Sequence, residues 1–594
     1  MEPAAEPTSL RRGVAVLVRY IRTHPRPFAL AVVGATLYAG GSVAGTIIVG
    51  RITDTVFRPA LTTGNVDART VWGTVAAVLL VAALRSVGVI TRRYCAAVTS
   101  RRMQVTLRAA IVEQYLRTPL AFHRARPTGE LLAHADTDVE VAVEVINPLP
   151  LSLGLVLLIA FASVALVVAD PVLALVGFLL FPAMAALNRY YTRRVEIPAE
   201  QTQQRVADVA TIAHESYDGA LVVKTLGLEQ REVERLSDAA GRLRDSRMVV
   251  GALRSTFEPA LDALPNLGVI AILALGGWRV STGALTAGQL VQVMLLFTLL
   301  SFPMRVVGFL LEEMPRSVVA IGRIDAVLAE PADAVPAAPI PLPEGSLAIE
   351  MRDVTFEYVA GERVLEHCSL RIEPGEIVAL VGATGSGKST LCELLVGLET
   401  PANGRVEIGG VPIADVDPSA LRRAAALVFQ ESFLFADSVA ENLTLGEVSL
   451  DAAAEAVRLA QAERFIARLS DGYDTVIGER GVTLSGGQRQ RTALARALVR
   501  GPRVLILDDA TSAVDPTVEA RILDGLKHEL DTTALIVAHR VSTIALADRV
   551  LFLRDGQIAA SGTHAELVER EPAYAAMVQA YERTPNEEVD DDDL

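Results

Sequence analysis

The first half of the chain alternates long apolar runs with arginine-rich segments. A helix that crosses a bilayer needs about 20 mostly apolar residues. Six runs approach or reach that length, the second and fifth only if each extends by a turn or more: Pro27–Gly50, Val71–Leu84, Val145–Ala169, Pro171–Asn188, Ala263–Trp278 and Val280–Met304. The pattern therefore predicts six membrane-spanning helices.

Arginines flank these runs unevenly. They cluster before the first run, between the second and third, and after the fourth: Arg11, Arg12, Arg19, Arg22, Arg26, Arg92, Arg93, Arg101, Arg102, Arg108, Arg117, Arg124, Arg126, Arg189, Arg193 and Arg194. Positively charged connections favour the cytoplasmic side. We therefore expect both termini in the cytoplasm, in an inner (plasma) membrane, with the connections at 51–70, 170–171 and near Arg279 facing out. Apolar residues at helical spacing predict that the long cytoplasmic connections continue the spans as helices.

A few charged residues interrupt or adjoin the runs, among them Arg85 in the second run. Such residues can mark a transport pathway. Long side chains also reach water from the membrane interface. We therefore expect Arg85 near the inner interface, and favour that interpretation over contact with a transported molecule.

The second half has a different character. A proline-rich stretch, Pro331–Pro343, marks a linker, and after it short strand-like runs alternate with helical ones, beginning with Leu347–Phe356 and Ile377–Val381. Residues 331–594 carry 23 Lys+Arg against 43 Asp+Glu, whereas residues 1–330 carry 32 against 27. The absence of a strong basic excess argues against a nucleic-acid partner, and three cysteines are too few for a disulfide scaffold. With 51% hydrophobic residues, the whole chain is also too apolar for a disordered protein.

The strand Ile377–Val381 runs into a glycine-rich loop that matches the phosphate-binding pattern G-x-x-x-x-G-K-[ST]: Gly382, Ala383, Thr384, Gly385, Ser386, Gly387, Lys388, Ser389 and Thr390. Glycines let backbone N–H groups surround phosphates at a helix start. Lys388 is expected to neutralise the β- and γ-phosphates, and the Ser389 hydroxyl to bind Mg²⁺. The loop therefore predicts a nucleotide site with ATP and Mg²⁺ as its ligands.

Two further segments support this interpretation. The apolar strand Val504–Leu507 ends in Asp508 and Asp509, and a carboxylate in that position is the expected second metal ligand. Between loop and strand lies Leu484-Ser485-Gly486-Gly487-Gln488, where serine and glycines before a helix form another anion-binding helix start.

These segments together resemble the ATPase domain of ABC transporters, whose signature is Leu-Ser-Gly-Gly-Gln. The resemblance implies a role for each matching residue. Ser485, Gly486, Gly487 and Gln488 would contact the ATP of a partner subunit. Tyr358 would stack on adenine, Gln430 would touch Mg²⁺ and the membrane domain, Asp515 would belong to the D-loop, and His539 would sense the γ-phosphate. The implied metal ligands are thus Ser389, Gln430 and Asp508.

The membrane half resembles the same family. Arg126–Leu132 is similar to the segment after the first coupling helix, His214–Lys224 to the second coupling region, and Gly283–Val291 to the start of the sixth span. The chain is thus identified as an exporter-type (type IV) half transporter that works as a dimer. The expected fold is an α-helical six-span transmembrane domain followed by an α/β P-loop ATPase domain of ABC type. The expected boundaries are an N-terminal cytoplasmic segment with an elbow helix, the spans, a linker, the ATPase domain and an acidic tail: 1–25, 26–325, 326–345, 346–582 and 583–594.

One residue departs from the family pattern. The family places a glutamate directly after the metal-side aspartate, as general base or anchor for the attacking water, and this chain has Asp509 there. The carboxylate is one methylene shorter and retracts by about 1.5 Å, and positioning errors of ~1 Å can cost ~100-fold in rate. Among the catalytic candidates Asp509, His539 and Gln430, only Asp509 departs. We therefore expect weak hydrolysis at this chain's own site, with its intact signature serving a partner's competent site, as in heterodimeric exporters.

Several alternatives stay open. A homodimeric multidrug or lipid exporter would contain two slow sites or a well-placed aspartate. An importer built on the exporter fold, for instance for siderophores, would have the same sequence features. A non-transporting ATPase that regulates a membrane partner fits less well, because six spans and both coupling segments are present. Few fixed charges in the spans, together with family analogy, indicate a hydrophobic or amphipathic small molecule as the transported substrate.

Overall fold

The computed structural model describes residues 18–583 except residues 65, 302, 360, 479, 480 and 482. Most of the expected N-terminal segment and nearly all of the acidic tail therefore lie outside the described residues. The chain forms two compact units, each described by itself below. The first comprises Met1–Tyr115 with Gly129–Ala329, and the second comprises Leu116–Thr128 with Glu330–Leu594.

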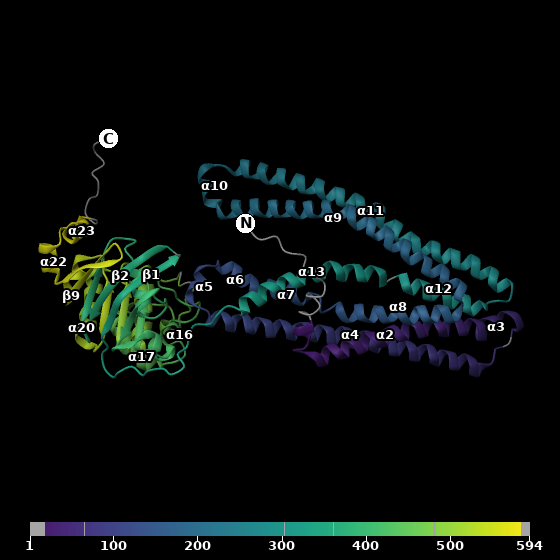
Figure 1. Ribbon diagram of the computed structural model, residues 1–594, viewed down its shortest axis with the longest axis horizontal. Helices are drawn as coiled ribbons and strands as arrows, with labels where there is room; N and C mark the ends of the chain where they lie inside the picture. The colour runs from purple at the N-terminus through teal and green to yellow at the C-terminus, as the bar shows by residue number, and fades with distance from the viewer. Residues whose placement is uncertain are drawn as a thin grey trace. The chain divides into compact units, whose positions relative to one another are not determined.

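The first unit is helical (Figure 1). Its elements are α2 (Pro25–Ile52), the π-helix η1 (Thr53–Phe57), α3 (Arg58–Thr63), α4 (Ala68–Arg117, whose last turn enters the second unit), α6 (Thr128–Ala135), α7 (Thr137–Glu144), α8 (Leu149–Ala169), α9 (Pro171–Asp218), α10 (Ala220–Leu226), α11 (Glu229–Ser281), α12 (Ala287–Ser301) and α13 (Pro303–Leu328).

The structure agrees with the predicted order of membrane spans. Among the described residues, five helical segments are long and apolar enough to cross a membrane, and the shorter apolar helix Ala287–Leu300 is a sixth candidate. The two short runs are each part of a much longer helix, α4 with 50 residues and α11 with 53. The prediction that the spans continue as helices beyond the apolar runs is thereby confirmed.

The expected continuous run Val280–Met304 was wrong as a single helix. The chain leaves α11 at Ser281 and enters α12 only at Ala287. Gly283 adopts φ +75°, a left-handed conformation that favours glycine and ends the helix. Thr286 and Gln289 then form a reciprocal cap, since Gln289 Oε1 accepts from Thr286 N at 2.9 Å and Thr286 Oγ1 accepts from Gln289 N at 3.0 Å. The Thr-x-x-Gln pattern of this cap is a helix-start signal visible in the sequence.

Helices α2 and α4 cross at two glycines. A Cβ atom on Gly34 would lie 2.7 Å from the Gly88 carbonyl oxygen, and one on Gly88 would lie 2.8 Å from the Gly34 carbonyl oxygen. No side chain fits there without separating the backbones. Small residues at such crossings let helices pack closely where lipid supplies no hydrophobic drive between them.

Polar contacts tie together the three connections that were predicted to face out. Asp170 caps α9 by accepting from Val172 N and Leu173 N, and its carboxylate lies 2.8 Å from the Arg279 guanidinium at the end of α11. Asp54 in η1 accepts from Thr286 Oγ1 at 2.6 Å and from Gly288 N at 2.8 Å. These connections therefore lie at one end of the helical bundle.

The second unit combines two sheets with helices. Its elements are α5 (Leu120–Arg124), β1 (Ile349–Val359), β2 (Glu362–Ile372), β3 (Ile377–Val381), α14 (Lys388–Leu395), β4 (Asn403–Ile408), β5 (Val411–Pro412), η2 (Ile413–Asp415), α15 (Pro418–Ala424), β6 (Ala425–Val428), α16 (Val439–Thr444), α17 (Leu450–Leu459), α18 (Glu463–Ile466), η3 (Gly472–Asp474), α19 (Gly486–Val499), β7 (Val504–Asp508), α20 (Pro516–Glu529), β8 (Thr533–Val537), α21 (Val541–Leu546), β9 (Arg549–Arg554), β10 (Gln557–Gly562), α22 (His564–Arg570) and α23 (Pro572–Arg583).

The larger sheet positions the functional residues. Its strand order is β10-β9-β3-β8-β7-β6, and every neighbouring pair from β9 to β6 is parallel. Strands β3, β7 and β8 are buried along their whole length, as expected for a parallel sheet covered on both faces. Ligands of such sheets bind beyond the carboxyl ends of the strands. The smaller sheet is antiparallel, in the order β2-β1-β4-β5.

The glycine crossing generates a stability prediction. Replacing Gly88 by leucine forces α2 and α4 apart, which costs about 1–3 kcal/mol or more because the neighbouring atoms are backbone. Gly73 lies on the same helix with nothing within 4 Å of an added Cβ, so Gly73→Leu is the matched control. We expect the Gly88→Leu protein to lose its monodisperse chromatographic peak at a lower temperature in detergent, and Gly73→Leu to behave as wild type. Equal behaviour of the two variants would contradict the close crossing.

Candidate functional site

The glycine-rich loop links β3 to α14, and its backbone packs closely against neighbouring segments. A Cβ on Gly382 would lie 2.4 Å from the Leu553 carbonyl oxygen, and Gly385 and Gly387 have φ of +81° and +99°. These three positions therefore require glycine. The remaining loop residues Ala383, Thr384 and Ser386 lead directly into Lys388 at the first turn of α14.

Lys388 and Ser386 are the polar groups inside this loop. The Lys388 ammonium donates to the carbonyl oxygens of Gly382 and Ala383, at 2.8 and 2.9 Å. Burial lowers the pKa of this ammonium, and the carboxylates of Asp508 and Asp509 oppose the shift. Ser386 Oγ is buried and has no hydrogen-bond partner among the described residues. A buried cation and an unpaired hydroxyl in a loop of backbone N–H groups suit an anionic phosphate.

Asp508 ends β7 beside the start of α14. Its side chain is 7% exposed, and the Ser389 hydroxyl hydrogen-bonds it. Burial raises the pKa of the Asp508 carboxyl, while that hydrogen bond and Lys388 work against the shift. A hydroxyl and a carboxylate in contact form an oxygen donor set of the kind that Mg²⁺ prefers. Ser389 and Asp508 therefore fit the magnesium that the resemblance implies.

Asp509, the departure from the family pattern, has an unusual backbone. Its φ is +49°, a left-handed conformation in which aspartate is several-fold more common than most residues. Its Oδ2 accepts a hydrogen bond from Gln430 Nε2 at 3.0 Å, just beyond β6. Burial raises the pKa of the Asp509 carboxyl, His539 opposes this shift, and the neighbouring Asp508 adds to it. The short carboxylate is therefore held by Gln430.

His539 follows β8 and completes the group at the sheet edge. Burial lowers the pKa of its imidazole, although the nearby Asp509 carboxylate opposes the shift. Its Nδ1 lies 3.2 Å from the hydroxyl of Tyr581 on α23. The same hydroxyl donates to the Gly382 carbonyl oxygen at 3.4 Å. A tyrosine from the last described helix thus joins the histidine to the glycine-rich loop.

Tyr358, the expected adenine platform, lies against the start of α14. Its hydroxyl is 3.0 Å from Thr390 Oγ1 and 3.1 Å from Glu393 Oε2. The guanidinium of Arg124 on α5 stands over the ring at 5.3 Å from its centroid. Arg124 also forms ion pairs with Glu393 and, at 2.8 Å, with Glu399. The helix α5 therefore contacts both the aromatic ring and the helix that carries Lys388.

The signature segment begins α19. Ser485 and Gln488 form a capping box at its N-terminus. Gly486 and Gly487 pack against the D-loop segment, where a Cβ on Gly487 would lie 2.6 Å from the Ala513 carbonyl oxygen. Asp515 caps α20 by accepting from Thr517 N at 2.8 Å. Signature and D-loop segments are thus neighbours.

The predicted site residues fall into two groups. The structure brings Lys388, Ser389, Asp508, Asp509 and His539 together, with Gln430 bonded to Asp509 and Tyr358 bonded to Thr390. The signature and Asp515 form the second group, and in the described part of the chain no hydrogen bond or ion pair joins it to the glycine-rich loop.

The sequence reasoning missed Tyr581, Arg124 and Glu393. Glu393 follows the glycine-rich motif by one helical turn on α14. Tyr581 and Arg124 are far from that motif in the sequence, and the folded chain brings them to the site.

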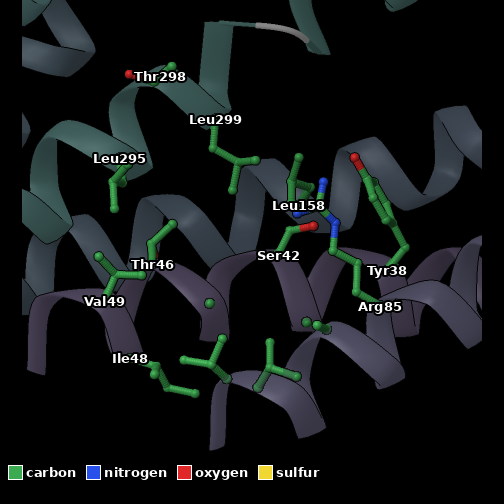
Figure 2. A pocket seen from close by; sticks show the side chains of 15 residues that line it. Tyr38, Ser42, Thr46, Ile48, Val49, Arg85, Leu158, Leu295, Thr298 and Leu299 are labelled. Carbon is green, nitrogen blue, oxygen red and sulfur yellow. The ribbon is translucent and has the colours of Figure 1, made fainter. Parts of the chain in front are cut away.

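A separate cavity of about 480 Å³ lies within the helical unit, between α2, α4, α8 and α12 (Figure 2). Its walls are mostly apolar, with Val49, Leu158, Leu295 and Leu299 among them. Arg85 is the charged residue of this lining, with its guanidinium 5.4 Å from the centroid of the Tyr38 ring.

The polar groups of this cavity lie midway along the helices. Among the described side chains Arg85 has no carboxylate within ion-pair distance, and the buried Ser42 hydroxyl has no partner. Tyr38 and Ser42 occupy the middle of α2. Arg85 thus sits beside the middle of α2 and lines this cavity, and its depth relative to the inner interface stays a prediction.

Comparison with known proteins identifies both units. The family described as the ABC transporter transmembrane region matches residues 28–304, and the family described as ABC transporter matches residues 365–512. An ATP-dependent lipid A-core flippase of Thiobacillus denitrificans is 33% identical over 96% of this chain and 98% of its own length. A multidrug efflux ATP-binding/permease protein of Mycobacterium bovis is 34% identical over 91% of this chain, which spans 45% of that relative.

The fold comparison agrees. A bacterial Atm1-family ABC exporter with ATP bound superposes with a TM-score of 0.74 at 28% identity, covering 98% of this chain and 100% of the other.

Proposed function

The chain belongs to the ABC transporter family and has the exporter-type architecture, and from this premise we propose that it is one subunit of a heterodimeric, ATP-driven exporter of hydrophobic or amphipathic molecules. Its own nucleotide site binds ATP and hydrolyses it slowly. Its signature serves the competent site of a different partner chain. The replacement of the family's glutamate by Asp509, held by Gln430 at 3.0 Å, carries this proposal.

ATP binding follows from the residues gathered at the sheet edge. Lys388, the loop N–H groups and the Ser386 hydroxyl would hold the phosphates, and Tyr358 would support the base. Ser389 and Asp508 would hold Mg²⁺, with Gln430 within reach. When bound, the metal neutralises charge that develops between the β- and γ-phosphates. All of these groups are present, so we expect the site to bind ATP.

Slow hydrolysis follows from the reach of Asp509. A carboxylate that orients the attacking water must approach it within hydrogen-bonding distance. Aspartate ends one methylene short, and its Oδ2 is occupied by the Gln430 amide. Burial raises the pKa of the Asp509 carboxyl, and the nearby His539 opposes this shift. The short reach of the carboxylate and its hydrogen bond to Gln430 both act against hydrolysis.

The second subunit follows from the signature. Anion-binding helix starts act only on a ligand in front of them, and within the described chain the signature contacts the D-loop segment. We propose that it faces ATP held by the partner. That this chain spans 45% of a multidrug relative fits a transporter made of two such halves.

A homodimer is the second candidate. It is favoured by the lipid A-core flippase relative, because the two proteins match over nearly the whole length of both chains. Both candidates share the same ATP-driven cycle, in which closure of two ATPase domains is transmitted through the segments at Arg126–Leu132 and His214–Lys224.

The cavity supports an amphipathic substrate. A volume of about 480 Å³ lies within the range of small-molecule pockets, which are mostly apolar with a few polar groups that orient the ligand. Here Arg85 and the Ser42 hydroxyl are those groups. An unpaired guanidinium among apolar walls favours a substrate with an acidic head and an apolar body.

The chain's placement in the membrane is also part of the proposal. Both termini lie in the cytoplasm of the inner (plasma) membrane, and the end of the bundle that contains Asp170 and Asp54 faces out. The proposal includes the five segments expected from the sequence, with the ATPase domain at 346–582.

The proposed slow site is tested by lengthening one side chain. The purified chain alone should hydrolyse ATP slowly, and Asp509→Glu should raise its rate by about tenfold or more, because a ~1 Å correction is worth up to ~100-fold. Asp524→Glu, on the exposed side of α20, is the matched control and should change nothing. Rapid turnover by the wild-type chain, or no gain in Asp509→Glu, would contradict the proposal.

The partner is tested by co-purification. The tagged chain, extracted from its own membranes in mild detergent, should bring down a second half transporter with glutamate after its metal-side aspartate, in equal amount by mass spectrometry. Recovery of this chain alone as a dimer would support the homodimer instead.

The substrate class is tested at Arg85. In vesicles that contain the complete transporter, Arg85→Gln should reduce uptake of an acidic amphipath such as a fluorescent fatty acid by about tenfold, and leave uptake of a neutral analogue of equal length unchanged. The physical reason is the loss of the single positive charge in the cavity. Equal loss for both compounds would show that Arg85 acts through structure instead of charge.

A further inference from the structure

We infer that Tyr581 is a positioning residue of the nucleotide site, whose hydroxyl fixes the ring orientation and the tautomer of His539 and ties helix α23 to the glycine-rich loop. This inference rests on the proposed ATP-hydrolysing function of the site. It does not depend on whether the site is slow or competent.

The placement of Tyr581 follows from the packing of α23. Tyr574 and Val578, two turns and one turn earlier on the same helix face, are buried in a cluster with Ala538 and Phe552. Residues at i, i+4 and i+7 share a helix face, so burial of Tyr574 and Val578 directs Tyr581 toward the same side. That side carries the end of β8, where His539 begins the loop. The position of the phenol is therefore set by the core and not by the site alone.

The hydroxyl of Tyr581 bridges two parts of the site. It lies 3.2 Å from His539 Nδ1 and donates to the Gly382 carbonyl oxygen at 3.4 Å. The rings of Tyr581 and His539 also meet edge to face, with centroids 5.6 Å apart. Gly382 begins the phosphate-binding loop, and its carbonyl oxygen accepts from Lys388 as well. The C-terminal helix thus contacts both the histidine and the loop that holds the phosphates.

The direction of these hydrogen bonds selects one tautomer. A phenol has a single proton, and the inferred arrangement donates it to the Gly382 carbonyl oxygen instead of to His539 Nδ1. The phenol oxygen then accepts from His539 Nδ1–H, because the ring nitrogen that is protonated is set by the bond that nitrogen makes. In the neutral ring, Nε2 is left without a proton and available to the reacting groups. Without the hydroxyl, the proton of neutral His539 could sit on either ring nitrogen, because the contact between the two rings favours neither.

The chain offers a matched control on the same helix. Tyr574 is fully buried, and its hydroxyl lies 2.7 Å from Nδ1 of His564, which is not part of the site. Tyr574→Phe and Tyr581→Phe each remove one hydroxyl that contacts a histidine and leave an aromatic ring in place. Only the second removes a contact with His539.

The direct test is the tautomer of His539. The full chain in lipid, labelled with ¹⁵N histidine, contains eight histidines, and the signals that vanish in His539→Gln belong to His539. We expect the Nδ1–H form of neutral His539 in wild type and in Tyr574→Phe, and a shift toward the Nε2–H form in Tyr581→Phe. Unchanged His539 signals in Tyr581→Phe would overturn the inference.

A functional test uses a double-mutant cycle. Tyr581→Phe should lower kcat for ATP by about 2- to 12-fold, the range that corresponds to one net hydrogen bond, with KM for ATP within twofold of wild type. In a His539→Ala background the same change should have no further effect, because groups that act through one another are not additive. Additive losses would show that Tyr581 acts independently of His539.

The cycle is run both in the wild-type chain and in the Asp509→Glu background. A missing gain from Asp509→Glu would count against the proposed slow site and leave the coupling between Tyr581 and His539 readable in the wild type. The two ideas can therefore fail separately.

Discussion

The shared direction of the strands from β9 to β6 is the constraint on which the nucleotide site depends. Because these strands are parallel, their carboxyl ends meet at one edge. That edge receives the glycine-rich loop from β3, Asp508 from β7 and His539 from β8, although these residues are far apart in the chain. Burial then lowers the pKa of Lys388 and His539 and raises the pKa of Asp508, so it disfavours the charged form of each group. A bound nucleotide with its metal would reverse part of that cost, so the site is electrostatically incomplete by itself.

Asp509 shows how a single side chain can separate binding from cleavage. Lys388 and Ser389, which would hold phosphate and metal, come from the loop after β3, whereas Asp508 directly precedes Asp509 at the end of β7. Its left-handed backbone is a strained conformation of the kind that clusters at functional sites. Aspartate tolerates this conformation better than longer side chains do, so the local backbone and the shorter carboxylate are compatible. The substitution therefore changes the chemistry of the site and leaves its architecture in place.

The parts of the molecule that sequence predicts well are those with local signals. Residue spacing predicted the glycine-rich loop, and apolar run length predicted the order of the spans. The break before α12 was expected near Arg279 and lies a few residues later, at 282–286, because run length was weighted above the cap at Thr286 and Gln289. Tyr581 lies far from every recognised motif, and Arg124 lies just before the segment that resembles a coupling region, where nothing in the sequence indicated a contact with Tyr358. The setting of Arg85 likewise depends on how α2 and α4 cross, which apolarity alone does not determine.

The ion pair of Asp170 and Arg279 has a consequence for how the two helices α9 and α11 can separate. The Asp170 carboxylate is buried and the Arg279 guanidinium is partly exposed. If the helices part, the buried carboxylate loses its charged partner, and that loss is costly unless water replaces it. Water must therefore enter as the helices part. Hydration of the contact between these two charges then limits how readily this end of the bundle can open.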